Sequence, residues 1–204
     1  MRILCIADEE LMEFWDYYVS GRLKEYDLIL SSGDLKAAYL SFVVTMARAP
    51  VLYVHGNHDT GYAVTEPEGC DSIDGKIVEY RGLRILGLGG CVWYRPGDHQ
   101  YTQKEMAKRL RRLRWEIAKY GGVDIVVTHA PPEGVGDSDD MAHRGFRSFL
   151  GLNLALHPPK FLLKQKAALH DIYHFLPLPV HVSRFLTEEI LKYLRLLHIR
   201  QLPL

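Results

Sequence analysis

Short apolar runs alternate along the chain with segments in which apolar side chains recur at helical spacing. The runs are rich in β-branched and aromatic residues and end in Gly or polar residues, which is typical of buried strands. In the first third of the chain they lie at 2–7, 26–31 and 51–55. Helical spacing follows at 11–18 and 36–48. This β-α-β-α-β order predicts an α/β fold with a parallel sheet and right-handed crossovers.

The middle of the chain continues the alternation of strands and helices. The elements expected there are a surface loop at 60–75, a hairpin of strands at 76–80 and 83–88, an amphipathic helix at 102–120 and a buried strand at 123–128. Thr102 and Glu105 have the spacing of a capping box at the start of the helix. Its Lys and Arg side chains suit RNA contact, but no aromatic platform alternates with them, so a solvated helix face is favoured.

The last third of the chain changes character. It predicts a Gly- and Asp-rich loop at 131–142, a helix at 145–156 and a short apolar run at 161–163. Residues 164–204 are rich in His and Leu and contain three prolines. We therefore expect one domain over 1–163, followed by an atypical C-terminal tail that is not a separate domain.

Composition narrows the class of protein. A chain of 204 residues with 48% hydrophobic and 25% charged residues suits a single globular core. The formal net charge is zero, so no nucleic acid or anionic membrane is indicated as a partner. Apolar runs are too short to span a bilayer. Cys5, Cys70 and Cys91 lack C-x-x-C spacing and predict free thiols in a reducing, cytoplasmic setting.

Polar side chains follow four of the predicted strands. Asp8 and Glu10 follow the first strand, Asp34 the second, Asn57 the third, and His129 the strand at 123–128. One such residue is explained by helix capping. Four at the carboxyl ends of strands in one sheet indicate a ligand site. Carboxylates, an amide oxygen and imidazole suit a divalent metal, and a shared carboxylate would hold two ions roughly 3.5–4 Å apart.

The turn after the third strand reads Gly56-Asn57-His58-Asp59. Gly, Asn and Asp are ordinary turn residues, but a turn has no structural need of His58. The order D-x-E, G-D, G-N-H-D, T-H-A-P-P resembles the metallophosphoesterase family, also called calcineurin-like phosphoesterases, from residue 1 to about 163. The resemblance implies an α/β/β/α sandwich of two mixed sheets flanked by helices.

The resemblance also implies a ligand set for two divalent ions. Asp34 would bridge both ions, Asp8 would bind one of them, and Asn57 and His129 would bind the other. The wider family begins with D-x-H, whereas here Glu10 stands in the place of that histidine. A carboxylate at this position favours hard ions, so manganese is expected first, with iron, magnesium or zinc as alternatives.

The catalytic roles follow from the same resemblance. His58 would act as the general acid that protonates the leaving oxygen, or would stabilise the transition state. Asp59 would hold its imidazole in position. Arg144, after the histidine loop, would meet a phosphate or else serve as a surface or capping residue. The implied activity is a metal-dependent phosphohydrolase, in which metal-activated water attacks a small phosphate ester. A phosphodiester, a nucleotide and a phosphoprotein all stay open as substrates.

One family motif is missing. Relatives close the site with G-H-x-H, but this chain has Lys-Gln-Lys-Ala-Ala at 164–168 and no G-H-x-H anywhere. Each ion would lose a ligand, and the second sheet would be truncated. His170, His174 and His181 could supply replacements, or the tail could be a frameshifted end.

Two other functions compete with the hydrolase. A catalytically weak member that binds a metal or phosphoryl ligand without turnover is favoured by the missing motif and opposed by the intact His58-Asp59 pair. A Rossmann-like nucleotide-binding module is disfavoured, because no glycine fingerprint follows the first strand. Gly87 to Gly90 also lacks the third glycine of that fingerprint, and predicts a tight strand exit. The oligomeric state stays open.

Overall fold

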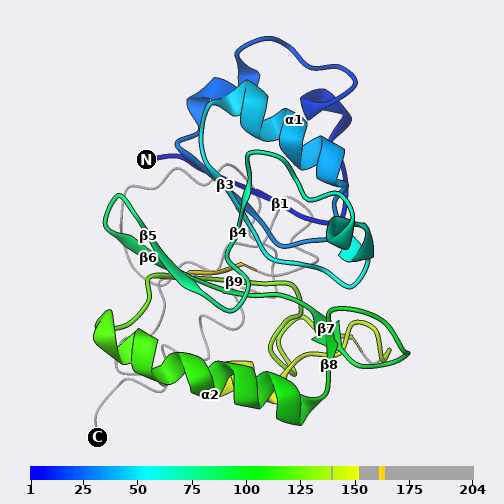
Figure 1. Cartoon of the computed structure of the whole chain (residues 1–204), viewed down its shortest axis with the longest axis vertical. Coiled ribbons are helices and arrows are strands. Elements are labelled where there is room, and N and C mark those ends of the chain that lie inside the picture. The colour runs from blue at the N-terminus through cyan, green and yellow to red at the C-terminus, as the bar shows by residue number, and fades with distance from the viewer. Residues whose placement is uncertain (139, 152–160, 164–204) are drawn as a thin grey trace, which may run out of the picture.

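A computed structural model describes residues 1–138, 140–151 and 161–163. Over these residues the protein is a mixed α/β structure with two four-stranded sheets and a small two-stranded one. The first sheet is parallel throughout, in the order β1-β2-β3-β4 (Figure 1). Its strands are β1 (Ile3–Ile6), β2 (Leu28–Ser31), β3 (Val51–Tyr53) and β4 (Asp71–Ser72). The predicted parallel pairing of the first three strands is confirmed.

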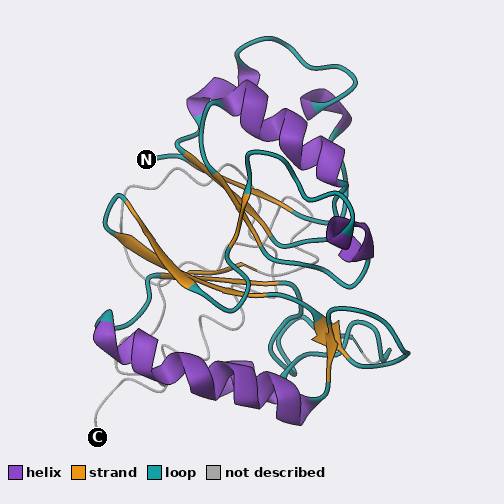
Figure 2. Ribbon diagram, viewed as in Figure 1, coloured by secondary structure: helices purple, strands orange, loops and turns teal. Residues whose placement is uncertain are grey.

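Helix α1 (Ala37–Ala47) crosses from β2 to β3, as its apolar spacing predicts. Tyr39, Leu40 and Val43 are fully buried and belong to the core cluster that also includes Ile29 and Val51 of the sheet. The helix ends at a left-handed residue, Arg48. The buried apolar side chains of α1 hold the helix against the outer face of the first sheet, as Figure 2 shows.

The helix predicted at 11–18 is wrong. Two short 3₁₀ turns, η1 (Met12–Phe14) and η2 (Arg22–Glu25), occupy the crossover from β1 to β2. The apolar residues at helical spacing still face the core, where Phe14 is buried and Trp15 packs against the cluster around α1. The segment 11–18 contains four aromatic residues and an aspartate, which have only modest helix propensity, so its core-facing apolar residues pack without a continuous helix.

The second sheet has the order β10-β9-β6-β5. Its strands are β5 (Ile77–Tyr80), β6 (Leu83–Leu88), β9 (Ile125–Thr128) and β10 (Phe161–Leu163). Strands β5 and β6 form the predicted antiparallel hairpin, whereas β6, β9 and β10 run parallel. A separate pair, β7 (Cys91–Val92) and β8 (Gln100–Tyr101), lies beside the sheet ends (Figure 1).

Helix α2 (Gln103–Lys119) covers the outer face of the second sheet (Figure 1). The predicted capping box is present: Thr102 Oγ1 accepts a hydrogen bond from the Glu105 backbone at 3.2 Å, and the Glu105 carboxylate accepts one from the Thr102 backbone at 2.8 Å. Met106 and Leu113 face the core. The basic side chains point largely to solvent, as their spacing predicts.

The two sheets pack face to face. Buried side chains from both sheets form one cluster between them: Leu28, Leu30, Leu52, Val54, Ile73, Ile85, Ile125 and Val127. Helix α1 lies outside the first sheet and α2 outside the second (Figure 2). Because β2, β3 and β9 are buried on both faces, their sequences read as continuous apolar runs.

Several elements differ from expectation or fall outside the description. The predicted loop at 60–75 contains a 3₁₀ turn, η3 (Asp59–Ala63), as well as strand β4. Of the helix predicted at 145–156, α3 (Arg147–Leu150) is described, and 152–160 lie outside the described residues. The tail at 164–204, with its histidines and the expected truncation of the second sheet, also lies outside them. No described helix is long and apolar enough to cross a membrane.

Candidate metal centre

The carboxyl ends of β1 and β2 each turn sharply at an aspartate. Asp8 and Asp34 both have positive φ, at 60° and 59°, a conformation that short polar residues such as Asp tolerate better than most. The Asp8 backbone N–H donates to the Gly33 carbonyl at 3.2 Å, which ties the two turns together. Because the strands are parallel and adjacent, both carboxylates reach the same cavity.

Two glycines allow the turn after β3 to approach the turn after β2. A Cβ atom on Gly33 would collide with the backbone of Gly56, and a Cβ on Gly56 would collide with the carboxylate of Asp34. Gly33 also has a φ of +96°, which favours glycine. Gly33 and Gly56 are therefore needed so that the two turns can lie in close contact, and this role does not require a bound ligand.

Hydrogen bonds fix this contact. Asp34 Oδ1 accepts from the His58 backbone N–H at 2.9 Å. Asp59 Oδ2 accepts from the backbone N–H groups of Gly56, at 2.7 Å, and of Asp34, at 3.0 Å. Burial raises the pKa of Asp59, although these two bonds oppose the rise. The sequence assigned Asp59 to the imidazole of His58, but the hydrogen bonds described for its carboxylate go to the backbone.

The prediction that all four strands belong to one sheet is wrong for His129, which comes to the same place from the second sheet. It follows β9 directly and is fully buried. Its Nδ1 lies 2.8 Å from the Ser32 carbonyl oxygen. Its Nε2 lies 3.0 Å from Asn57 Oδ1 and 3.6 Å from Asp34 Oδ2. The structure thus brings together Asp34, Asn57 and His129, which are far apart in the sequence.

The proton on the His129 ring can be placed from its partners. A carbonyl oxygen only accepts, so Nδ1 facing Ser32 must carry the proton. In the neutral ring Nε2 is then a bare lone pair. It faces Asn57 Oδ1, and the amide nitrogen of Asn57 is directed to the Tyr94 hydroxyl at 3.3 Å. With the ring neutral, acceptor atoms of His129, Asn57 and Asp34 face one another, and either a bound cation or a second ring proton would satisfy them.

A cavity of about 700 Å³ is lined by Asp34, whereas Asn57 and His129 are not among the residues of its wall. Its wall includes five of the predicted site residues: Asp8, Glu10, Asp34, His58 and Asp59. Lys36 also lines it, and its Nζ lies 3.1 Å from a carboxylate oxygen of Glu10. The Glu10 side chain therefore lies at the cavity and is paired with the ammonium group of Lys36.

Arg144 is not brought to this cavity. It is exposed and is not among the residues of the wall. In the same loop, the carboxylate of Asp140 is paired with the ring of His143, whose Nδ1 lies 2.8 Å from Asp140 Oδ1. Of the two roles considered from the sequence, the position of Arg144 favours that of a surface residue.

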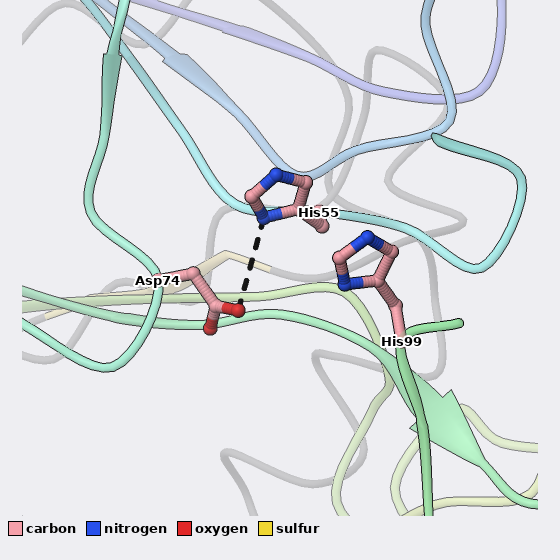
Figure 3. Close-up of side chains that lie close together, drawn as sticks. All are labelled: His55, Asp74 and His99. Atoms are coloured by element: carbon pink, nitrogen blue, oxygen red, sulfur yellow. Dashed lines mark ion pairs between the residues drawn. The ribbon is translucent and has the colours of Figure 1, made fainter. Parts of the chain in front are cut away.

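Sequence reasoning missed a second group of side chains that could hold a metal ion: His55, Asp74 and His99 (Figure 3). One ligand atom from each lies within 4.8 Å of the other two. Burial alone would raise the pKa of Asp74, but His55 and Arg109 outweigh it and lower the pKa to about 2. Asp74 and His99 lie in segments without periodicity, and only His55, next to the Gly-Asn-His-Asp turn, carried a signal.

Comparison with known proteins adds no family to these observations. No protein-family model matches the chain, and no curated protein matches it in sequence. The segment where G-H-x-H was expected, 164–168, lies outside the described residues.

Proposed function

We propose that the chain is a metal-dependent phosphohydrolase of the metallophosphoesterase kind. The fold supports this, because two facing sheets with a helix outside each match the α/β/β/α sandwich implied by the motifs. The positions of Asp8, Asp34 and Asn57 also support the proposal, because they follow adjacent parallel strands at the carboxyl edge of the first sheet, where ligands bind in open α/β sheets.

The observation that carries the proposal is the group of acceptors around His129. Nε2 of this fully buried ring faces Asn57 Oδ1 at 3.0 Å and Asp34 Oδ2 at 3.6 Å, while its own N–H is held by the Ser32 carbonyl. An imidazole fixed through its other nitrogen in this way is typical of a metal ligand. Asp34, Asn57 and His129 would hold one ion. Asp8 and Glu10, with Asp34, would hold a second.

The donor set fits hard or borderline divalent ions, with manganese first and iron, magnesium or zinc as alternatives. When bound, such an ion lowers the pKa of water and polarises a phosphoryl oxygen. No G-H-x-H occurs in the sequence, so each ion has fewer ligands than in a complete relative. We therefore expect weak metal affinity and activity that depends on added metal.

The chain's own residues supply the remaining steps. His58 is exposed on the cavity wall, and its backbone is anchored on Asp34 Oδ1. In this position its imidazole donates a proton to the leaving oxygen. Asp59 holds the turn rigid through two backbone hydrogen bonds. A cavity of about 700 Å³ suits a small phosphorylated substrate.

The test is a metal titration. The protein is purified without chelator, its bound metal is measured, and hydrolysis of an aryl phosphodiester is followed as manganese is added. We expect hydrolysis that rises with manganese and disappears with chelator. Hydrolysis that chelator leaves unchanged would contradict the proposal. Two tightly held ions with full turnover would show instead that tail residues complete the site.

A binding protein of the same fold is the second candidate. The observation that favours it is the ion pair between Lys36 and Glu10, because a cation of the protein already neutralises one predicted ligand. This candidate predicts that manganese binds and that a phosphate ester is retained without turnover. Equilibrium dialysis against an aryl phosphodiester, combined with the hydrolysis assay, separates the two candidates.

A further inference from the structure

His55, Asp74 and His99 form a cluster outside the cavity described above, since none of them lines its wall. They come from three separate segments: the end of β3, the connection between β4 and β5, and the loop between β7 and β8. Figure 3 shows the two imidazoles and the carboxylate turned toward one another. Each side chain is partly buried.

The cluster contains a polar atom without a partner. His55 Nδ1 is buried and makes no hydrogen bond in the described structure. The nearest charged atom is Asp74 Oδ2 at 3.8 Å, beyond hydrogen-bond distance. Buried polar atoms are nearly always satisfied, so an unpartnered ring nitrogen indicates a ligand that the protein alone does not supply.

Asp74 is oriented by groups outside the cluster. Its Oδ1 accepts the Gly89 backbone N–H at 2.7 Å and Arg109 Nη2 at 2.6 Å. Arg109 is itself fixed, since its Nη1 donates to the Gly89 carbonyl at 3.0 Å and its guanidinium lies over the Tyr101 ring. These contacts leave Oδ2 directed at His55, as a carboxylate held for ligation would be.

His99 completes the group. Its ring stacks on that of His55, with centroids 4.3 Å apart and planes 8° apart. Burial, and then the neighbouring His55, lower the pKa of His99. Its backbone has a φ of 54°, which is unusual for a residue other than glycine and holds the ring over His55.

We propose that His55, Asp74 and His99 bind one divalent transition-metal ion of the zinc class, with water completing its shell. Two imidazoles and one carboxylate are a common ligand set for zinc. Ligand atoms around tetrahedral zinc lie roughly 3.4 Å apart, from bond lengths near 2.1 Å. Here all three atoms already lie within 4.8 Å, so small side-chain rotations close the site.

The charge around the site selects among ions. Arg109 pairs with Asp74 and offsets its charge, so hard ions that rely on carboxylates, such as magnesium and calcium, gain little there. Zinc and cobalt bind neutral imidazole well. The proposal does not depend on phosphohydrolase activity, because it uses none of the residues assigned to the metal centre.

The test counts zinc equivalents in the full-length chain after chelator treatment and removal of the chelator. Calorimetry with zinc gives the number and affinity of sites, and cobalt absorption reports nitrogen ligation. His99→Gly is the informative variant, because glycine accepts the positive φ and offers no ligand atom. His143→Gly is the matched control at a partly buried histidine that lies outside the cluster and is paired with Asp140. Circular dichroism verifies that each variant is folded.

We expect His99→Gly to bind one zinc fewer than the unmodified chain, or to bind that ion at least about 100-fold more weakly, since even residues behind a ligand change affinity 10–100-fold. His143→Gly should match the unmodified chain. The substitution Asp34→Asn distinguishes this site from the candidate metal centre. The Asp34→Asn chain should keep one zinc ion, and the double variant that also carries His99→Gly should lose it. Equal zinc binding with and without His99 would overturn the proposal, as would a chain that binds no zinc.

Discussion

A buried polar residue lies next to each end of strand β9, and the two residues have different surroundings. At the start, Asp124 is only 4% exposed. Its two oxygens accept from the guanidinium of Arg84 at 2.8 and 3.1 Å, and one of them also accepts the Arg84 backbone N–H at 3.0 Å. Arg84 in turn donates to the carbonyls of Tyr120 and Gly121. The chain itself thus neutralises the charge of Asp124 and supplies hydrogen-bond donors to both of its carboxylate oxygens.

The other end of β9 has no such balance. His129 is fully buried, and its Nε2 faces the acceptor oxygens of Asn57 and Asp34 rather than a donor. One end of the strand therefore adjoins an ion pair that the chain completes by itself, and this arrangement stabilises the fold. Under the proposed function, the acceptors at the other end would stabilise the folded state only when a metal ion is bound.

The sharpest test of this contrast removes the carboxylate proposed to be shared between both ions. Asp34→Asn keeps the shape of the side chain and its capacity to accept the His58 backbone N–H. It removes the charge proposed to hold the metal. We expect hydrolysis to fall by more than about 10⁴-fold, beyond the usual contribution of one acid or base, together with loss of bound manganese. Unchanged manganese content would place the ions elsewhere.

His58 should separate catalysis from metal binding. Replacing His58 with Ala removes the proposed proton donor, so turnover should fall by roughly 10²–10⁴-fold. Metal content should stay the same, because His58 is not a proposed ligand. The control is His143→Ala, at a histidine paired with Asp140. If His58→Ala strips manganese along with activity, the role assigned to His58 is wrong.

At the opposite end of β9, mutation should affect stability instead. Arg84→Gln leaves the buried carboxylate of Asp124 uncompensated. The free energy of unfolding should fall by about 3 kcal/mol, at the low end for a buried pair because a quarter of the Arg84 side chain is exposed. Arg2→Gln breaks an exposed pair with Glu25 and should cost at most about 1 kcal/mol. Urea unfolding measures both. Equal losses would contradict the assignment of Asp124 as structural.

The sequence predicted the elements best where two independent physical signals agreed. Helix α2 has both a periodic apolar face and a capping box, and its bounds match the prediction to within one residue at each end. The crossover at 11–18 has only the apolar face, and the chain satisfies that face with 3₁₀ turns. The spacing of apolar residues predicts which side chains are buried, whereas local propensity determines whether the backbone forms an α-helix or 3₁₀ turns.

The candidate site was predictable to the extent that strand ends define it. Asp8, Asp34 and Asn57 gather because parallel neighbours place their carboxyl ends together, and this follows from the strand order. Asp59 was assigned to an imidazole, although its carboxylate binds backbone amides, because hydrogen bonds to the main chain leave no sequence pattern. The cluster of His55, Asp74 and His99 depends on loop packing, for which the sequence carries no periodic signal.

The smallest expected effect is also the one that tests the contrast most directly. If the acceptors around His129 oppose one another without metal, replacing Asn57 with Leu should relieve them. Asn57→Leu should therefore raise the free energy of unfolding of the metal-free protein by about 1 kcal/mol, or leave it unchanged. The matched variant Asp124→Leu should lower it by about 3 kcal/mol, because Arg84 then loses its partner.

With manganese bound, the unmodified chain should become more stable than the Asn57→Leu variant. At a hundred times its dissociation constant, a ligand bound only by the folded state adds about 2.7 kcal/mol of stability. The unmodified chain should gain stabilisation of this size, and Asn57→Leu should gain less, because it lacks the amide oxygen that lies 3.0 Å from His129 Nε2. Urea unfolding with chelator and with manganese measures all four states. A metal-free Asn57→Leu protein destabilised by about 3 kcal/mol would show that Asn57 and His129 satisfy each other, as Arg84 and Asp124 do, and the contrast between the two ends of β9 would fail.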